Sequence, residues 1–268
     1  MKLLNGRELA DYVKERQLKQ VRALRQAEGV IPKLAIIKMT DNPVIDTYVR
    51  LKQRYGEDIT IEVVVFDVTN DTVLETIAAC NDDASIHGII VQLPLLDGTM
   101  TEEAINLVLP EKDVDALGEA ATLTPATPMA IDWLLAGYNV TLKDKKIGIV
   151  GNGRLVGAPL AKLWRTAGHD VTVCDRATEN LPEVLRSMDI IVTAAGAPRL
   201  ITSDMVAQKA VVVDAATSSE NGELVGDVAP DVRERQDLTI TPEKGGVGPL
   251  TVAALFDNVI RAARASIS

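Results

Sequence analysis

Tyr48 and Lys52 are the first side chains in the sequence whose types and spacing could support chemistry. They lie four residues apart in a segment expected to be helical, 44–55, and residues at that spacing share one face of a helix. An aromatic ring beside an ammonium group could bind a flat heterocycle and polarise it. The alternative is a packed tyrosine next to a solvent-exposed lysine, and the pair alone is compatible with both interpretations.

A polar residue at the end of an apolar strand favours the first interpretation. Gln92 lies near the end of the apolar run 88–93, which Pro94 stops. Ligand sites in open α/β sheets gather at the carboxyl ends of strands, and a buried amide needs a hydrogen-bond partner. The Lys52 ammonium could be that partner, so we predict a ligand site that contains both residues.

Two further segments carry groups that could bind a ligand. The segment 112–115 reads Lys-Asp-Val-Asp after a proline turn, and one of its carboxylates could pair with a ring nitrogen and an amino group. A solvated acidic loop is the alternative. The segment 241–251 places three glycines before an expected helix, so its free amides could approach a cofactor and a substrate. Its alternative is an ordinary glycine-rich lead-in to a helix.

A glycine-rich loop between an expected strand and an expected helix indicates a dinucleotide site. The strand 147–150 is followed by Gly151, Gly153 and Gly157, in the spacing GxGxxxG rather than the strict GxGxxG. Small residues let the chain turn sharply and approach a pyrophosphate, which the amides at a helix N-terminus can bind. A tight structural turn would use the same glycines, but the place of the loop within a βαβ unit favours dinucleotide binding.

The next expected strand ends in two residues that favour different cofactors. Asp175 lies at about the 20-residue separation typical of an acid that binds the ribose of NAD. Its carboxylate would repel the 2′-phosphate of NADP, whereas the guanidinium of Arg176 could pair with that phosphate. Either residue could instead simply end the strand, so these residues leave NAD and NADP both open.

Strands alternate with helices along the chain, which predicts parallel sheets in two α/β domains. In the first series we expect helices at 7–28, 44–55, 71–82 and 101–108, strands at 34–37, 59–66 and 88–93, and a turn at Asp41-Asn42-Pro43. After a Thr/Pro-rich break at 122–128 and a connecting helix at 128–137, the second series has strands at 147–150, 171–174, 190–194, 210–213 and 238–240. We therefore predict a three-layer α/β substrate domain over 1–120, joined by a last helix within 250–268, and a Rossmann-like dinucleotide domain over 140–249.

The composition argues against several other classes of protein. The 268 residues are 47% hydrophobic and 25% charged, which is ordinary for a globular protein and unlike a disordered one. The net charge is -10, without the basic, aromatic-containing runs of a nucleic-acid-binding protein. We also expect no membrane span, a cytoplasmic location and no metal, with Cys80 and Cys174 as separate buried thiols.

These motifs occur in the order found in the bifunctional methylenetetrahydrofolate dehydrogenase/methenyltetrahydrofolate cyclohydrolase family. The chain resembles that family over nearly its whole length. The resemblance rests on the following runs: Asn42-Pro43, Tyr48-Val49-x-x-Lys52, Gly88-Ile89-Ile90-Val91-Gln92-Leu93-Pro94-Leu95, Pro110-Glu111-Lys112-Asp113-Val114-Asp115, Thr124-Pro125-Ala126-Thr127-Pro128, Val156-Gly157-x-Pro159, Gly226-Asp227-Val228 and Gly245-Gly246-Val247-Gly248-Pro249-Leu250-Thr251.

The resemblance implies oxidation of methylene-tetrahydrofolate by a nicotinamide cofactor and hydrolysis of the methenyl product to formyl-tetrahydrofolate, in one-carbon metabolism. Lys52 would be the general acid and base of the hydrolysis, and Gln92 would position it. Tyr48 would orient the folate and Asp115 would hold its pterin ring. The other implied folate contacts are Val91, Leu93, Pro94, Gly246, Pro249 and Thr251.

The resemblance also implies cofactor contacts and an assembly. The cofactor would be NADP, with NAD as the alternative, and the protein would be a homodimer formed mainly through the dinucleotide domain. The implied cofactor contacts are Gly151, Asn152, Gly153, Arg154, Val156, Gly157, Asp175, Arg176 and Gly248.

Most departures from the family pattern lie on the cofactor side. Asn152 and Gly153 stand where the family commonly has Arg-Ser, and Asp175-Arg176 follow Cys174 where it commonly has His-Ser. Two alternatives therefore stay open. One is an oxidoreductase similar to shikimate or amino-acid dehydrogenases, and the other is a catalytically silent homologue that binds dinucleotide or folate.

Overall fold

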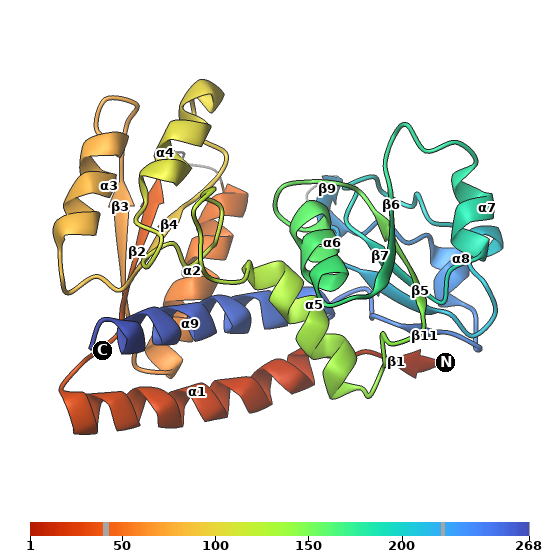
Figure 1. Ribbon diagram of the computed structural model, residues 1–268, viewed down its shortest axis with the longest axis horizontal. Helices are drawn as coiled ribbons and strands as arrows, with labels where there is room; N and C mark the ends of the chain where they lie inside the picture. The colour runs from red at the N-terminus through yellow and green to blue at the C-terminus, as the bar shows by residue number, and fades with distance from the viewer. Residues whose placement is uncertain (40–42, 221–222, 268) are drawn as a thin grey trace. The chain divides into compact units, whose positions relative to one another are not determined.

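The structure is a computed structural model that describes residues 1–39, 43–220 and 223–267 (Figure 1). Asp41 and Asn42 of the predicted turn lie outside the described residues. The chain divides into two compact units, which we describe separately. Unit 1 comprises Met1–Ala10 and Thr127–Thr251, and unit 2 comprises Asp11–Ala126 and Val252–Ser268. Among the described residues, no helix has both the length and the apolar composition of a membrane span.

Unit 2 is built on a three-stranded parallel sheet. The strands lie in the order β3 (Glu62–Asp67), β2 (Lys33–Lys38) and β4 (Gly88–Val91). The central strand is buried and apolar at four consecutive positions, 34–37, as expected for a strand covered on both faces. Successive side chains alternate between the faces, so each face needs its own layer of helices.

Two layers of helices cover this sheet. On one face Ala35 and Ile37 belong to a buried cluster that includes residues of α3 (Val73–Asp82) and α4 (Thr101–Leu107). On the other face Gly56 of α2 (Pro43–Asp58) approaches Val63, and Gly88 approaches Val259 of α9 (Val247–Ala265). The remainder of α1 (Gly6–Glu28) beyond its first turns also belongs to this unit. The predicted three-layer α/β domain is confirmed.

Unit 1 is built on a six-stranded parallel sheet. Its strands lie in the order β1 (Lys2–Leu3), β11 (Thr239–Ile240), β8 (Val211–Asp214), β7 (Ile190–Thr193), β5 (Lys146–Val150) and β6 (Asp170–Cys174). From β5 the chain goes to β6 on one side and then crosses to β7 on the other side. The strand order therefore reverses at β5, which is the topological switch point of a Rossmann-like sheet, as predicted.

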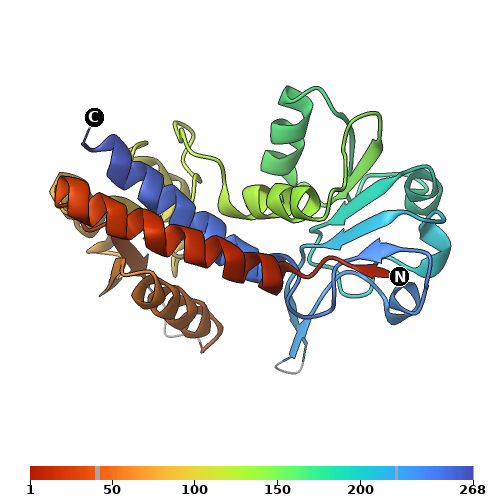
Figure 2. The ribbon, with the colours of Figure 1, turned by 90° about the horizontal axis from the view of Figure 1, so that it is seen from below.

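Helices and one separate ribbon complete unit 1. Trp164 of α6 (Gly157–Thr166) donates to Asp132 of α5 (Ala126–Gly137) at 3.2 Å. Leu185 of α7 (Leu181–Arg186) and Val232 of α8 (Pro230–Arg233) lie in a buried cluster with residues of β5 and β8. Strands β9 (Ser218–Glu220) and β10 (Glu223–Val225) form an antiparallel two-stranded ribbon, which appears in light blue in Figure 2.

The structure corrects the predicted extent of the first domain. Residues 1–10 belong to unit 1, because Lys2 and Leu3 pair in parallel with Thr239 and Ile240 and so complete its sheet. A strand of two residues has too few side chains to show an alternating pattern, so no sequence pattern indicated it. The short helices α7 and α8 and the β9–β10 ribbon were missed for the same reason.

Candidate active site

The helix α2 presents Tyr48 and Lys52 one turn apart. Ile45 and Val49 on the same helix are buried, whereas Tyr48 and Lys52 are both half-buried. A Cβ atom at Gly56 would lie 2.5 Å from Val63 of β3, so the helix and the sheet are in close contact there. The apolar face of α2 thus fixes the helix, and the neighbouring face carries the two predicted catalytic residues.

The predicted partnership of Lys52 and Gln92 is present in the structure. Lys52 Nζ donates to Gln92 Oε1 at 2.8 Å. The main chain of Gln92 extends the sheet by one residue beyond β4, because its N–H donates to the Ile37 carbonyl at 2.8 Å. The side-chain Nε2 donates to the Leu93 carbonyl at 3.2 Å. That second bond orients the amide so that its oxygen faces Lys52.

The charged residues of the segment 112–115 have different partners. Lys112 Nζ donates to the carbonyls of Cys80, Asn81 and Asp83 at 3.1, 2.6 and 2.8 Å, so this ammonium caps the C-terminus of α3. Asp113 is buried and accepts the Gly118 amide at 2.9 Å, which fixes the loop that follows. These two residues position the segment and leave Asp115 as its carboxylate whose charge acts on Lys52.

Asp115 and Lys52 influence each other's charge. Burial lowers the pKa of the Lys52 ammonium, and the carboxylate of Asp115 opposes that shift. Burial likewise raises the pKa of Asp115, and the charge of Lys52 opposes it. Desolvation therefore disfavours the charged form of both groups. A lysine whose pKa is lowered in this way can lose its proton closer to neutral pH, as a general base must.

Three charged residues that sequence analysis did not select hold the beginning of α2. Lys38, at the end of β2, pairs through Nζ with Asp46 of α2 at 3.1 Å and with Asp67 at the end of β3 at 2.8 Å. The two carboxylates raise the pKa of Lys38. Asp46 lies two residues before Tyr48 in the helix. A lysine at the end of an apolar strand was the one available signal for this arrangement.

The remaining residues predicted to contact folate fall into two groups. Val91 is buried in β4, Leu93 is half-buried, and Pro94 is exposed after a cis peptide bond. Gly246, Pro249 and Thr251 belong to unit 1, as does the predicted cofactor contact Gly248. Of these, Gly248, Pro249 and Thr251 lie in the first turns of α9.

The glycine run before α9 has a packing role of its own. A Cβ atom at Gly6 would overlap the carbonyl of Gly246, and the Arg7 amide donates to the Gly245 carbonyl at 3.1 Å. Gly245 has a φ of +86°, a conformation that glycine adopts without strain. The run therefore packs against the beginning of α1.

The three glycines of the dinucleotide loop have different surroundings. Gly151 has a φ of +102°, and a Cβ atom there would lie 2.5 Å from the Ala194 carbonyl oxygen. A Cβ atom at Gly157 would overlap the carbonyl of Gly151. At Gly153, by contrast, a Cβ atom would meet nothing within 4 Å. Gly151 and Gly157 therefore set the course of the loop, and Gly153 leaves open space in front of it.

The open side of this loop suits a pyrophosphate. The loop leads from the carboxyl end of β5 into α6, with Val156 as the residue before the first helical position. Asn152, Gly153 and Arg154 are exposed, so their main chain is accessible to a ligand. The amides at the N-terminus of a helix attract phosphate, and here they lie at the switch point of the sheet. The residues present therefore fit a dinucleotide.

The strand β6 ends in an exposed turn that contains Asp175 and Arg176. The carboxylate of Asp175 accepts the Ala177 amide at 2.9 Å, and the Asp175 amide donates to Thr178 Oγ1 at 2.9 Å. Asp175 therefore stabilises its own turn. The guanidinium of Arg176 is exposed on the same turn.

Two family models match the chain. The model "Tetrahydrofolate dehydrogenase/cyclohydrolase, catalytic domain" matches residues 4–115, and "Tetrahydrofolate dehydrogenase/cyclohydrolase, NAD(P)-binding domain" matches residues 125–267. The bifunctional protein FolD of Methanosphaerula palustris is 39% identical over 265 residues, which cover 94% of this chain and 95% of that protein. The corresponding protein of Anoxybacillus flavithermus is 37% identical over 277 residues, which cover 98% and 97%.

Solved structures give the same result. The bifunctional FolD enzyme of Campylobacter jejuni matches with a TM-score of 0.93 and 34% identity over 99% of both chains. The FolD enzyme of Trypanosoma brucei, complexed with NADP and an inhibitor, matches with a TM-score of 0.93 and 29% identity over 99% and 98%. Shikimate 5-dehydrogenase of Thermus thermophilus, at 14% identity and a TM-score of 0.57 over 88% of this chain and 100% of that one, shares the fold alone. The resemblance derived from the motifs is confirmed, and the chain belongs to the tetrahydrofolate dehydrogenase/cyclohydrolase family.

Proposed function

We propose that this protein catalyses two consecutive reactions on a folate-bound carbon. The first oxidises methylene-tetrahydrofolate to methenyl-tetrahydrofolate with a nicotinamide dinucleotide, and the second hydrolyses the methenyl group to a formyl group. The observation that carries this proposal is the hydrogen bond of 2.8 Å between Lys52 and Gln92. The charge of Asp115 also acts on Lys52. Membership of the family and the open dinucleotide loop support the proposal.

Lys52 is the general base and acid of the hydrolysis. Its neutral amine takes a proton from the water that attacks the methenyl carbon. When the ring opens, the resulting ammonium returns a proton to the departing folate nitrogen, and the hydroxyl proton of the adduct is released to solvent as the formyl C=O forms. Gln92 accepts one N–H of this amine and so holds the nitrogen in place, with its lone pair directed away from Gln92. Tyr48, on the same helical face, orients the folate rings. Asp115 holds the ring nitrogen and amino group of the pterin.

The dehydrogenase reaction depends on unit 1. When bound, the nicotinamide supplies the hydride acceptor. Gly151 and Gly157 shape the loop that receives the pyrophosphate, and Gly153 leaves open space in front of it. Asn152, Arg154 and Val156 complete the proposed contacts of this loop. This chain's contribution to the step is to bind and orient the dinucleotide. Gly246, Gly248, Pro249 and Thr251 are proposed to complete the folate and cofactor contacts.

NADP is the cofactor that we propose, with NAD as the alternative. Arg176 is exposed at the end of β6, where a guanidinium could pair with the 2′-phosphate. The nearby Asp175 carboxylate opposes NADP, although one of its oxygens already accepts the Ala177 amide. We prefer NADP because the positive charge of Arg176 could pair directly with the negative 2′-phosphate.

Replacement of Lys52 by Met tests the proposed hydrolysis. The variant keeps the length of the side chain and loses its proton-transfer group, so we expect methenyl hydrolysis to fall by about 100-fold or more. The absorbance of methenyl-tetrahydrofolate measures the rate, with an enzyme-free blank subtracted. Hydrolysis close to the wild-type rate would remove Lys52 from the mechanism. A wild-type protein inactive in both reactions would instead support the catalytically silent alternative.

We also propose a homodimer formed mainly through unit 1. In the described part of the chain, β9 and β10 pair only with each other and belong to neither parallel sheet. This ribbon projects from unit 1 (Figure 2), and strands with open edges tend to associate with another chain. Light scattering should give twice the mass of the chain. A monomer mass at micromolar concentration would contradict the proposal.

A further inference from the structure

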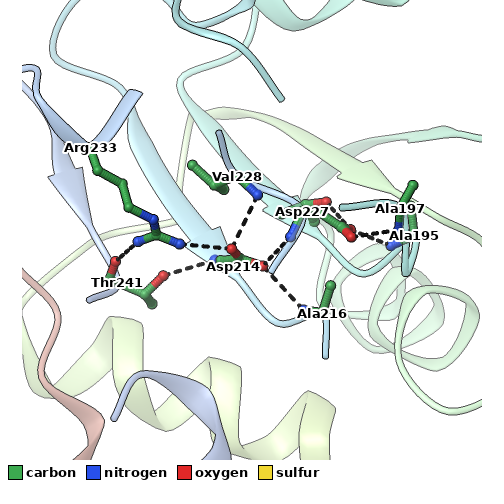
Figure 3. Close-up of polar contacts among 9 residues, drawn as sticks. Ala195, Ala197, Asp214, Ala216, Asp227, Val228, Arg233 and Thr241 are labelled. Atoms are coloured by element: carbon green, nitrogen blue, oxygen red, sulfur yellow. Dashed lines mark hydrogen bonds and ion pairs between the residues drawn. The ribbon is translucent and has the colours of Figure 1, made fainter. Parts of the chain in front are cut away.

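Asp227 is a fully buried carboxylate of unit 1 that accepts three hydrogen bonds (Figure 3). Its Oδ2 accepts from Thr193 Oγ1 at 2.6 Å and from the Ala195 amide at 2.7 Å. Its Oδ1 accepts from the Ala197 amide at 2.7 Å. Thr193 ends β7, and the two amides belong to the loop that follows, 194–197. Because charge-assisted hydrogen bonds are stronger than neutral ones, Asp227 fixes the course of this loop.

A second carboxylate, Asp214 at the end of β8, holds Asp227 in place. Asp214 accepts the backbone amides of Asp227 and Val228, each at 3.2 Å, and pairs with Arg233 Nη2 at 2.8 Å (Figure 3). A Cβ atom at Gly226 would overlap this carboxylate, which explains the glycine of the Gly226-Asp227-Val228 run. The backbone of Asp227 is thus fixed before its side chain reaches the loop.

The loop that Asp227 holds is in direct contact with the first glycine of the dinucleotide loop. A Cβ atom at Gly151 would lie 2.5 Å from the Ala194 carbonyl oxygen and 2.8 Å from Ala195 Cα. Ala195 is also the residue whose amide Asp227 accepts. Since there is no space between these backbones, a shift of the 194–197 loop must move Gly151 or open a gap beside it.

These contacts follow the order of the strands in the sheet. Arg233 Nη1 donates to the Thr241 carbonyl, which directly follows β11, at 2.8 Å. Asp214 then ends β8, Thr193 ends β7, and Gly151 directly follows β5. The strands lie in the order β11-β8-β7-β5, and all are parallel. The network therefore runs along the carboxyl edge of the sheet, where ligands of such folds bind, and ends at the dinucleotide loop.

We propose that Asp227 is a positioning residue for the nicotinamide dinucleotide. By holding the 194–197 loop against Gly151, its carboxylate keeps the dinucleotide loop in its binding conformation. This inference rests on the proposed binding of the cofactor at residues 151–157. All three partners of the Asp227 side chain are hydrogen-bond donors. An amide in its place would offer one acceptor oxygen, and its N–H would face a donor.

The Asp227→Asn variant tests this role in the full-length protein. We expect its dissociation constants for NADP and for NAD, measured by calorimetry, to rise about tenfold or more, as for a lost hydrogen bond to a charged group. The KM for dinucleotide should rise with them. Methenyl hydrolysis by the same preparation should stay within about twofold of wild type, because that reaction uses Lys52 of unit 2 and consumes no cofactor.

Asp237→Asn is the matched control for lost hydrogen bonds in the same unit. Asp237 also accepts three donors, Arg235 Nε, Arg235 Nη2 and the Lys209 amide, at 3.0, 2.7 and 3.0 Å. It precedes β11, so it lies at the opposite edge of the sheet. We expect this variant to lose stability without a change in the dissociation constant for dinucleotide. An equal loss of affinity in both variants would overturn the proposal.

Gly153→Asp separates this inference from the proposed cofactor site. The position has space for a side chain, and a carboxylate there would repel a pyrophosphate. If Gly153→Asp binds dinucleotide like wild type, the proposed cofactor site is wrong. If Gly153→Asp binds weakly and Asp227→Asn binds normally, the cofactor site stands and the positioning role is overturned.

Thr193→Val keeps the proposal testable if Asp227→Asn does not fold. Valine matches the shape of threonine and removes only the hydroxyl that donates to Asp227. We expect the dissociation constant for dinucleotide to rise about twofold to tenfold with hydrolysis retained. Thr193→Ser, which keeps the hydroxyl, should restore binding. If Asp227→Asn does not fold and Thr193→Val binds dinucleotide as tightly as wild type, the proposal is overturned.

Discussion

Replacement of Gln92 by Glu places a negative charge at the atom that now accepts from Lys52 Nζ at 2.8 Å. With the full screening of bulk water, a unit charge at that distance stabilises the ammonium by about 1.5 kcal/mol, which is about one pKa unit. Lys52 is half-buried, where screening is weaker. We therefore expect the pKa of Lys52 to rise by about 1 to 3 units.

The sign of the effect on hydrolysis follows from the form of Lys52 that reacts. Burial lowers the pKa of Lys52 below its ordinary value, and the neutral amine is the proposed base. Activity should thus rise with pH until Lys52 is deprotonated. In Gln92→Glu the same rise should occur at higher pH. At a fixed pH below the pKa, the rate should fall about tenfold for each unit of the shift.

The rate of methenyl hydrolysis between pH 6 and 9, corrected with an enzyme-free blank at each pH, measures this shift. Gln92→Met is the uncharged control. It removes the hydrogen bonds of Gln92 to Lys52 and to the Leu93 carbonyl, of which Gln92→Glu loses only the second, and it adds no charge. Its profile should stay in place or move to lower pH. If Gln92→Glu loses rate but its profile does not move to higher pH, deprotonation of Lys52 does not limit the reaction.

Two further predictions concern unit 1. Arg176→Ala should reduce kcat/KM for NADP by about tenfold to a hundredfold, the value of one charged contact, and leave kcat/KM for NAD unchanged. If the wild type prefers NAD and Arg176→Ala has the same kcat/KM for both cofactors as the wild type, Asp175 determines the choice between NAD and NADP. Gly157→Ala should cost about 1 to 3 kcal/mol of stability, because its Cβ would overlap the Gly151 carbonyl. Its melting temperature should fall by several degrees, whereas Gly153→Ala, which has open space, should melt like wild type.

The parts of the fold that sequence analysis predicted depend on local patterns. The expected strand at 147–150 corresponds to β5 (Lys146–Val150), and the expected helix at 44–55 corresponds to α2 (Pro43–Asp58). Lys52 and Gln92 were paired by two rules, the i and i+4 spacing of a helix and the position of ligands at strand ends. Each rule places one side chain on its own element, Lys52 on α2 and Gln92 directly after β4. The two side chains meet because α2 packs on the sheet that contains β4.

The residues that sequence analysis missed depend on contacts between distant segments. Asp214 ends the apolar strand β8 and Asp227 follows the short strand β10, but their partners lie on other strands and on α8. Asp227 was noticed only as part of a short run shared with the family. Lys38 had no predicted partner, because Asp46 and Asp67 come from a helix and a different strand. A sequence read segment by segment cannot supply such pairs.

The departures from the family pattern on the cofactor side fall at positions that do not shape the dinucleotide loop. Asn152, Asp175 and Arg176 are exposed, so a change of side chain there leaves the backbone free to keep its course. Gly151 and Gly157, which no larger residue could replace without a clash, are both present. Their close contacts keep the course of the backbone that would receive the pyrophosphate, and the changes are confined to exposed side chains around it. The pattern therefore favours an altered preference between NAD and NADP over a loss of cofactor binding.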